Sequence, residues 1–400
     1  MASPSARGYF VDVTRNTVLL TFASLFADIS TEMLYPVLPI FLTQSLKASG
    51  RVVGLVEGIG GATQNIVQGF SGSLSDKLRK RKSIAIVGYA LAAIAKPLIG
   101  LSAVWQGVLG GRFLDRLGTG IRSAPRDALI AASVDEESRG KAFGLEGVGD
   151  NAGAFLGPLL AIVLLSVLHV NIRLIFYLAA IPGLLALAMI LLVAEGRSAE
   201  PQAKVSVRLG RFPKAYWKYL LATAVFGIGN SSNAFLILQT KALGASLATT
   251  ILIYAAFNLV AALISYPAGS LSDRFSRRNV LLVSFALFLA TYLGFALKRS
   301  LVLIGALFVL YGLSQGIFRS AGKALASDFA PDDLRAGGVG WYGTTVGLSG
   351  LVASLIAGLL WDRVSHSAVF LFGTASALAG SLALLALIPS KSAQSGKAPS

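Results

Sequence analysis

Long apolar runs, separated by short polar segments, make up most of the chain. About 20 apolar residues are enough to cross a bilayer as a helix, and about twelve runs reach that length. The pattern therefore predicts an all-α integral membrane protein with twelve transmembrane helices. The runs lie near residues 14–42, 49–75, 83–103, 104–131, 141–168, 171–194, 214–241, 246–272, 279–297, 300–327, 337–361 and 367–388.

Basic residues gather in alternate loops between these runs. Loops expected on the opposite side hold only one or two of them, such as Arg173 alone. Because cytoplasmic loops carry the excess of Lys and Arg, we expect a multi-pass protein of the cytoplasmic (inner) membrane with both termini in the cytoplasm. The basic loop residues are Lys77, Arg79, Lys80, Arg81 and Lys82; Arg197, Lys204, Arg208, Arg211 and Lys214; and Arg274, Arg277 and Arg278.

Two charged phrases each occur twice at one spacing. "GSLSDKLRKRK" begins at Gly72 and "GSLSDRFSRRN" at Gly269, 197 residues later. Arg122 of "GIRSAPRDAL" and Arg319 of "GIFRSAGKAL" differ by the same offset. Parallel repeats of six helices are a known transporter plan. We therefore predict a six-helix bundle over 1–194, a cytoplasmic linker over 195–213, a second six-helix bundle over 214–389 and a disordered tail over 390–400.

Composition narrows the classes of function. Only 14% of residues are charged, against about 25% in soluble domains. The net charge of +16 lies in loops rather than on one basic face, which argues against a nucleic-acid partner. The chain has no cysteine and only His169 and His366 as histidines, and it lacks a P-loop or a nucleophile elbow. We expect no enzyme activity, cofactor or metal, and a monomer in the lipid bilayer.

The repeated phrase resembles a motif of the major facilitator superfamily, and the likeness extends over nearly the whole chain. That family places a Gly-x-Leu-x-Asp-Arg-x-Gly-Arg-Arg-like phrase after its second helix and often echoes it after the eighth. Arg79 and Ser276 stand where the loop glycine is usual. The resemblance implies the major facilitator fold and a secondary transporter. The matching positions are Gly72, Leu74, Asp76, Lys77, Lys80 and Arg81, and Gly269, Leu271, Asp273, Arg274, Arg277 and Arg278.

The repeated phrase is interpreted as a gate. Its glycine allows close helix packing, and its acid can cap a neighbouring helix N-terminus, where the helix dipole is positive. Such a cluster would latch the two halves in one state and release them in the other. The alternative is that the basic run only sets topology. The predicted gating residues are Gly72, Asp76, Lys80, Asp127, Gly269, Asp273 and Arg277.

A glycine pattern in the fifth run resembles the motif associated with antiporters. It consists of Gly144, Gly153, Gly157 and Pro158, with Ala161 in place of the terminal glycine. Glycines at i and i+4 leave a flat groove for another helix, and the proline permits a kink. The pattern favours export, although tight packing alone would also explain it.

Acids deep in the spans lie in the first half of the chain. Asp28 and Glu32 are one helical turn apart and share a face. Two close carboxylates in a low dielectric do not readily both ionise, so one is expected to hold a proton. Exporters of the resembled family often carry acids in this helix. The alternative is that each acid is neutralised by an arginine such as Arg112 or Arg116. The predicted proton-coupling residues are Asp28, Glu32, Asp115, Glu146 and Asp150.

Polar groups in both halves are candidates for substrate contact. Asn230 and Asn233 are expected on one face of the seventh helix, where they would hydrogen-bond either a substrate or a neighbouring helix. Arg112 and Arg116 would bind an anion or act as counter-ions for Asp28, Glu32, Asp150 or Glu146. The predicted substrate-binding residues are Arg112, Arg116, Asn230, Asn233, Tyr254, Asn258, Arg319 and Lys323.

Three functions follow from these features. The first is proton-coupled export of a small organic solute by alternating access. The second is uptake or exchange of an organic anion, bound by the arginines and Lys323. The third is a membrane sensor that does not transport. The expected partners are a small-molecule substrate, protons and the lipid bilayer.

Overall fold

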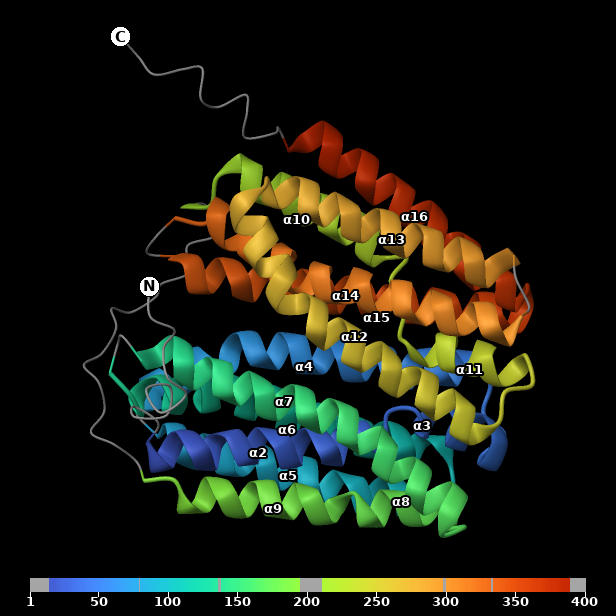
Figure 1. Ribbon diagram of the computed structural model, residues 1–400, viewed down its shortest axis with the longest axis horizontal. Helices are drawn as coiled ribbons and strands as arrows, with labels where there is room; N and C mark the ends of the chain where they lie inside the picture. Colours follow the sequence, from blue (N-terminus) through green and yellow to red (C-terminus); the bar gives the residue numbers. More distant parts are fainter. Residues whose placement is uncertain are drawn as a thin grey trace, which may run out of the picture. The chain divides into compact units, whose positions relative to one another are not determined.

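The computed structural model describes residues 14–78, 80–135, 138–194, 211–297, 300–331 and 334–388, and all regular secondary structure among them is helical (Figure 1). The predicted linker and tail fall largely outside these residues. The first half contains α2 (Arg15–Glu32), α3 (Leu38–Ile40), a π-helical turn (Phe41–Ser45), α4 (Gly50–Leu78), α5 (Arg81–Leu101), α6 (Trp105–Ala132), α7 (Arg139–Ile162), a second π-helical turn (Val163–Val167), α8 (Ile172–Leu178) and α9 (Ala180–Leu192). The second half contains α10 (Lys214–Gly227), α11 (Ala234–Ala242), α12 (Leu247–Arg274), α13 (Arg277–Leu297), α14 (Leu301–Phe329), α15 (Arg335–Arg363) and α16 (His366–Leu387).

The helices follow the apolar runs closely. Within the described residues, eight segments are long and apolar enough to cross a membrane. The other four expected spans are helical as well, but they are more polar or interrupted. Helices α2 and α6 carry several charges, and α4 is rich in glycine. The fourth span is divided into α10 and α11 by a non-helical segment. Several helices begin where a side chain caps the free N–H groups. Ser246 accepts a hydrogen bond from Thr249 N (3.0 Å) before α12, and Ser365 accepts one from Ala368 N (3.1 Å) before α16.

The seventh expected helix is broken, which corrects one prediction. The chain leaves the helical conformation between α10 and α11, at residues 228–233. Asn230 and Asn233 lie in this break, so the expectation that they share a helix face is wrong. The local sequence "GIGNSSN" explains it, because glycine destabilises a helix and Asn and Ser side chains compete for backbone hydrogen bonds.

The chain forms two compact units. The N-terminal unit contains residues 1–37 and 67–204, and the C-terminal unit contains residues 38–66 and 205–400. This grouping differs from the predicted bundles in residues 38–66. In the C-terminal unit, the first half of α4 packs on α15 through small residues: Gly54 lies against Ser354, and Gly358 lies against Gly50 and Arg51. The Asp362 carboxylate accepts hydrogen bonds from Gly50 N (2.8 Å) and Arg51 N (2.9 Å), so it caps the start of α4.

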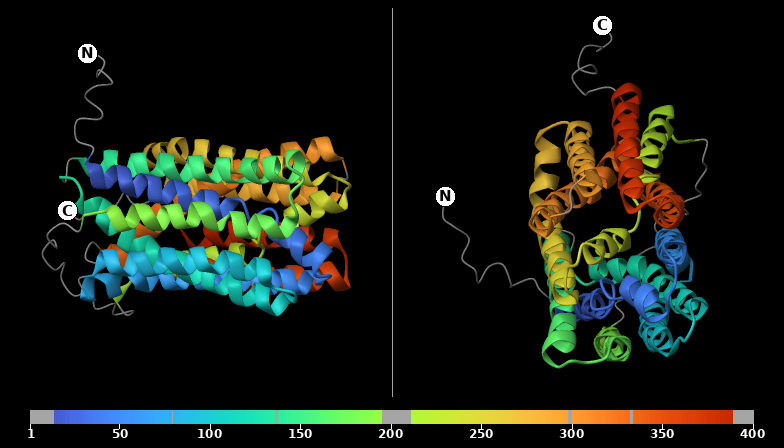
Figure 2. Two further views of the ribbon diagram at one scale, coloured as in Figure 1. Left: turned by 90° about the horizontal axis from the view of Figure 1, so that it is seen from below. Right: turned by 90° about the vertical axis from the view of Figure 1, so that its right-hand side faces the viewer.

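In the N-terminal unit, α2, α5, α6, α7 and α9 run side by side (Figures 1 and 2). Small residues bring these helices close together. Gly88 of α5 lies against the backbone of Gly118 on α6, and Gly183 of α9 lies against Ala93 of α5. An apolar cluster that includes Leu20, Ala27 and Ala186 fills the space among α2, α5 and α9. Such close spacing leaves little room between helices except where longer polar side chains lie.

The interior of the C-terminal unit is aromatic. Phe226 of α10 stacks on Phe285 of α13 with ring centroids 3.8 Å apart, and Phe288 stacks on Tyr292 at 4.0 Å. The helices α13 and α14 are also joined by hydroxyl groups, because Ser284 Oγ donates to the Ser314 carbonyl (2.8 Å) and Ser314 Oγ to the Ser284 carbonyl (2.9 Å).

Candidate functional site

The glycine face of α7 packs directly against α2. A Cβ atom added at Gly153 would lie 2.6 Å from the Leu25 carbonyl oxygen, and one added at Gly157 would lie 2.9 Å from Glu32 Cβ. Both distances are too short for a real side chain, so glycine permits this approach. The contact holds Asp28 and Glu32 of α2 beside α7.

The other two residues of the glycine motif are placed differently. A Cβ atom added at Gly144 would meet nothing within 4 Å, so close packing does not require a glycine there, contrary to the prediction. Pro158 is buried, and α7 continues past it to Ile162. The close contact with α2 is therefore carried by the middle of the motif.

Arg126 of α6 joins three helices through its guanidinium group. It lies 3.0 Å from Glu146 Oε1 and 3.5 Å from Asp150 Oδ1, both on α7. It also donates a hydrogen bond to Ser24 Oγ on α2 (2.9 Å), and this hydroxyl donates to Glu146 (2.8 Å). Its fourth partner is the adjacent Asp127, at 3.0 Å. One cation thus neutralises acids from two helices. The pairing of Arg126 with acids of α7 was not predicted from the sequence.

Asp28 faces a second arginine of α6, Arg122, which is buried. Its Oδ1 atom lies 3.8 Å from Arg122 Nη2, which is a loose ion pair. The Arg122 guanidinium also lies over the Tyr89 ring, 4.6 Å from the centroid. The Asp28 side chain remains 25% exposed.

Asp115 of α6 is surrounded by cations. Its carboxylate lies 3.0 Å from Lys96 Nζ, 3.3 Å from Arg112 Nη1 and 3.5 Å from Arg116 Nε. Its own side chain is only 2% exposed. Both arginines also lie near the Tyr35 ring, at 5.4 and 5.9 Å from its centroid. A buried charge needs such compensation, and Asp115 provides it for Lys96, which crosses from α5.

The described pairs revise the predicted roles of these residues. Arg112 and Arg116 pair with Asp115 on their own helix, an acid that was not among the partners expected from the sequence. Lys96 was missed altogether. Its signal was available, because it is the one charged residue between Ser83 and Ala103 in an otherwise apolar run.

The polar candidates of the C-terminal unit form hydrogen bonds around the helix break. Asn233 Oδ1 accepts from the Tyr311 hydroxyl (2.7 Å), and Asn230 Oδ1 accepts from Gln315 Nε2 (3.3 Å). Tyr254 is buried on α12, with its ring 5.7 Å from that of Phe257, and Asn258 is half-buried one turn further on. The structure therefore holds both asparagine side chains in place through α14.

Arg319 and Lys323 of α14 have exposed side chains. At the repeat offset they correspond to Arg122, which is buried, and Arg126, which is half-buried, both on α6. The repeat therefore preserves cations at matching positions but changes their surroundings.

The predicted gate is only partly visible. The side chains of Gly72, Asp76, Gly269 and Asp273 fall outside those that the structure describes. Lys80 is exposed, and the described partner of Asp127 is Arg126. Arg277 donates to the Ala324 carbonyl (3.0 Å) and pairs with Asp328, both on α14. Among the described residues, no group of three or more His, Asp or Glu side chains could hold a metal ion.

Comparison with known proteins agrees with this architecture. The chain matches the Major Facilitator Superfamily over residues 20–238 and 219–400. It is 36% identical over 385 residues to an uncharacterized MFS-type transporter of Methanocaldococcus jannaschii, which covers 94% of this chain and 95% of that protein. It is 27% identical over 330 residues to the multidrug resistance protein MdtG of Enterobacter lignolyticus, over 78% of this chain and 77% of the relative.

A solved structure shows the same fold at low sequence identity. A mutant form of the nucleoside transporter NupG matches with a TM-score of 0.80 at 14% identity, over 94% of this chain and 100% of the other. Together with the apolar helices, these matches identify the family of the protein. The chain belongs to the major facilitator superfamily and is a multi-pass membrane protein that acts as a secondary transporter of a small molecule.

Proposed function

We propose that this protein exports a small organic solute from the cytoplasm in exchange for protons. The observation that carries the proposal is the set of carboxylates on α2 and α7 that pair with two arginines of α6. Asp28 faces Arg122, and Glu146 and Asp150 share Arg126. Protonation of one acid would release its cation to a different partner. Proton binding is then coupled to how α2, α6 and α7 pack.

Asp28, together with Glu32 on the next turn, is the proposed coupling site. A coupling carboxylate must reach water in at least one state of the transport cycle. The Asp28 side chain is 25% exposed, whereas that of Asp115 is 2% exposed and has three cationic neighbours. We therefore assign proton exchange to Asp28 and Glu32, and an anchoring role to Asp115. The close packing of Gly153 and Gly157 on α2 holds Asp28 and Glu32 at a fixed position along the helix bundle.

The other assignments rest on the sequence and on family likeness. We place hydrogen bonds to the solute on Asn230, Asn233, Tyr254 and Asn258, and the gate on the repeated loop phrase. The basic loops support cytoplasmic termini. Export, rather than uptake, is supported by the glycine motif of α7 and by the similarity to a protein named for multidrug resistance.

Proton release tests the coupling site directly. Substrates would be found by a growth and export screen of a deletion strain against varied toxic compounds and metabolites. Adding a substrate to purified protein in weakly buffered solution should then release protons, because solute and proton compete for Asp28 and Glu32. The Asp28→Asn, Glu32→Gln double variant should release none, and the exposed loop variant Asp135→Asn should behave like the wild type. Undiminished release from the double variant would rule out this coupling site.

A second function is favoured by one feature of the same unit. Lys96, Arg112 and Arg116 all pair with the one carboxylate of Asp115, which is the kind of site that would attract an organic anion. Inverted vesicles with an imposed pH gradient separate the two functions. Proton-driven export predicts that the substrate dissipates the gradient and accumulates in the vesicles. Anion uptake or exchange predicts flux that follows the anion gradient. Binding without flux under either condition would indicate a sensor.

A further inference from the structure

The first membrane helix of each half of the chain is interrupted at the same position of the repeat. In the second half, the helix stops between α10 and α11, at residues 228–233. The counterpart 197 residues earlier overlaps the turn between α2 and α3. There, Met33 and Pro36 take the places of Asn230 and Asn233. An interruption at this position of the fold therefore does not require asparagine.

Serine side chains satisfy the backbone at the break between α10 and α11. Ser232 Oγ accepts a hydrogen bond from Ala234 N (3.2 Å), at the start of α11, and Ser354 Oγ of α15 accepts one from Ser232 N (3.2 Å). Interrupted backbone inside a membrane protein needs such partners. In the described part of the chain, the Asn233 side chain makes no capping hydrogen bond to α11. The serines close the break, and this asparagine has a different contact.

Both asparagine side chains contact one face of α14. Asn233 Oδ1 accepts from the Tyr311 hydroxyl (2.7 Å), and Asn230 Oδ1 accepts from Gln315 Nε2 (3.3 Å). Tyr311 and Gln315 are one helical turn apart and share a face. Both are buried, whereas the two asparagines are half-buried. Polar groups that are already held by the protein bind a ligand with a smaller loss of side-chain freedom.

The Tyr311 hydroxyl is held in place by aromatic packing. Tyr311 is 1% exposed, and its ring centroid lies 5.1 Å from that of Phe257 on α12 and 6.1 Å from that of Tyr292 on α13. Closely packed interiors leave such a ring little freedom to move. The hydroxyl therefore meets Asn233 from a fixed direction.

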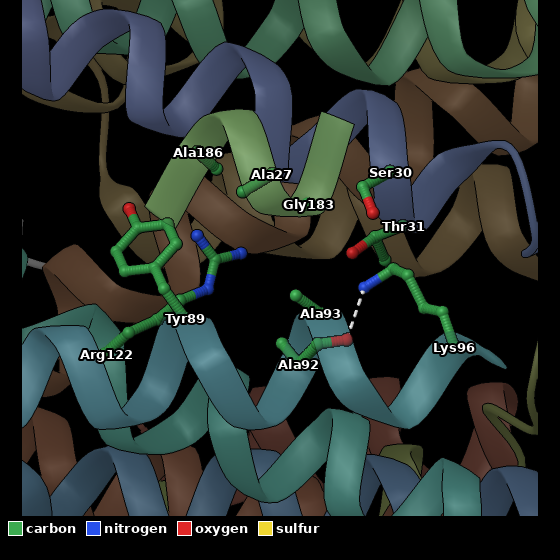
Figure 3. Close-up of a pocket in the computed structure, with 10 residues that line it drawn as sticks. All are labelled: Ala27, Ser30, Thr31, Tyr89, Ala92, Ala93, Lys96, Arg122, Gly183 and Ala186. Atoms are coloured by element: carbon green, nitrogen blue, oxygen red, sulfur yellow. Dashed lines mark hydrogen bonds between the residues drawn. The ribbon is translucent and has the colours of Figure 1, made fainter. Parts of the chain in front are cut away.

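The first half of the chain lacks this arrangement. At the repeat offset, Tyr311 and Gln315 correspond to Leu114 and Gly118, which have no hydrogen-bonding side chain. The hydroxyl groups just before the first interruption line a small cavity together with cations of α5 and α6 (Figure 3). The pairing of two asparagines with α14 is thus specific to the C-terminal unit and is not a requirement of the repeated fold.

We infer that Tyr311 is a positioning residue for transport, and that Gln315 has the same role one turn later. They hold Asn233 and Asn230 in the orientation that the solute meets. The inference rests on the proposed function, which places hydrogen bonds to the solute on these asparagines. Tyr311 acts through Asn233, and a solute bound in this way needs at least two hydrogen-bonding groups.

Tyr311→Phe tests the inference, because it removes the hydroxyl and keeps the ring. The probe is the compound with the highest transport rate in the export screen, measured in proteoliposomes. We expect KM to rise about fivefold, as for one lost hydrogen bond, with an unchanged maximal rate. Ser354→Ala is the matched control, because it removes a hydrogen bond from the serine side of the same break. It should lower Tm and leave KM unchanged. An unchanged KM in Tyr311→Phe would overturn the inference.

A double-mutant cycle with Asn233 shows whether Tyr311 acts through it. If it does, adding Tyr311→Phe to Asn233→Ala should raise KM no further. Asn233→Ser takes the place of Asn233→Ala should the latter fail to fold. Effects on KM that multiply in the double variant would overturn the inference and leave the proposed solute contacts standing. An unchanged KM in the Asn233 variant itself would instead refute the solute contact, and the inference would fail with it.

Discussion

The two units repeat one sequence plan but build their interiors from different chemistry. In the N-terminal unit, α5 and α6 are joined by the buried Lys96–Asp115 pair. The residues 197 positions later are Leu293 and Gly312. Here α13 and α14 are joined by reciprocal serine hydrogen bonds and by aromatic contacts such as the edge-to-face pair Phe295–Phe308 (5.5 Å). Ion pairs can be broken and re-formed by a proton, whereas aromatic stacking cannot. Under the proposed function, the N-terminal unit is therefore the one expected to respond to protons.

The arginines of the repeat show the same difference at single positions. Arg122 is buried against Tyr89 and near Asp28, but its counterpart Arg319 is exposed. Position 225, the counterpart of Asp28, is a valine. Among the described residues, the repeated cation forms an ion pair at Arg122 but shows none at Arg319. The surroundings of the repeated cation therefore differ between the two units.

Asp115→Asn should have the largest effect, because it removes the shared carboxylate of three buried cations. Breaking a buried ion pair by removing one partner costs about 3–5 kcal/mol. We expect a large fall in Tm and loss of transport in reconstituted vesicles. The matched change in the other unit is Ser314→Ala, which removes one hydroxyl from the α13–α14 contact and should cost about 1 kcal/mol.

A double-mutant cycle between Lys96 and Asp115 refines this prediction. If the pair is coupled, Lys96→Met combined with Asp115→Asn should be less destabilised than the sum of the single variants, by at least about 1 kcal/mol. Additive effects, or an Asp115→Asn variant as stable as Ser314→Ala, would show that the two interiors do not differ in this way.

Most of the fold could be predicted from the sequence, because crossing a membrane requires a long apolar helix. The run expected at 171–194 appears as α8 and α9, Ile172 to Leu192, and the run at 337–361 lies within α15. The break at 228–233 could not be found in this way. The mean hydropathy of a 20-residue segment changes little when it contains the five residues "GNSSN". The low helix propensity of these residues affects only the backbone close to them.

The pairing of charges in the site was much less predictable. The sequence indicated which half carries the deep acids, but it did not indicate that Arg112 and Arg116 pair with Asp115 on their own helix. Which acid meets which arginine depends on how each helix is rotated about its axis, and a shift of one residue turns a side chain by about 100°. Lys96 was not predicted, although a lone lysine in an apolar run is itself a signal of function.

Gly153→Val should have the next largest effect, because it separates α2 from α7. The added Cβ would lie 2.6 Å from the Leu25 carbonyl oxygen and 2.8 Å from Asp28 Cβ, and overpacking of this kind costs about 1–3 kcal/mol. We expect transport to fall at least tenfold. Gly144→Val is the matched control on the same helix, since its Cβ would meet open space. Equal transport rates for the two variants would show that the close contact between α2 and α7 is not needed for coupled transport.

Asp362→Ala tests a charge that lies at a helix end in the C-terminal unit. This carboxylate caps the start of α4 by accepting from Gly50 N and Arg51 N. Loss of an N-terminal cap costs about 1 kcal/mol, so Tm should fall by a few degrees. Asp362→Asn keeps one acceptor oxygen and should recover part of the loss. A fall as large as that of Asp115→Asn would remove the distinction between the two units.

Arg319→Gln should have the smallest effect on stability, because the side chain is exposed and substitutions at such positions usually change little. We expect Tm to stay within about 2 °C of the wild type. Its repeat counterpart, Arg122→Gln, leaves Asp28 without its partner and should lower Tm considerably more. If Arg319 binds an anionic part of the solute, the variant should raise the apparent KM while the maximal rate is kept. An unchanged KM with a lower rate would place Arg319 in gating. A Tm loss equal to that of Arg122→Gln would mean that the two repeated arginines still share one structural role, which the difference in their burial argues against.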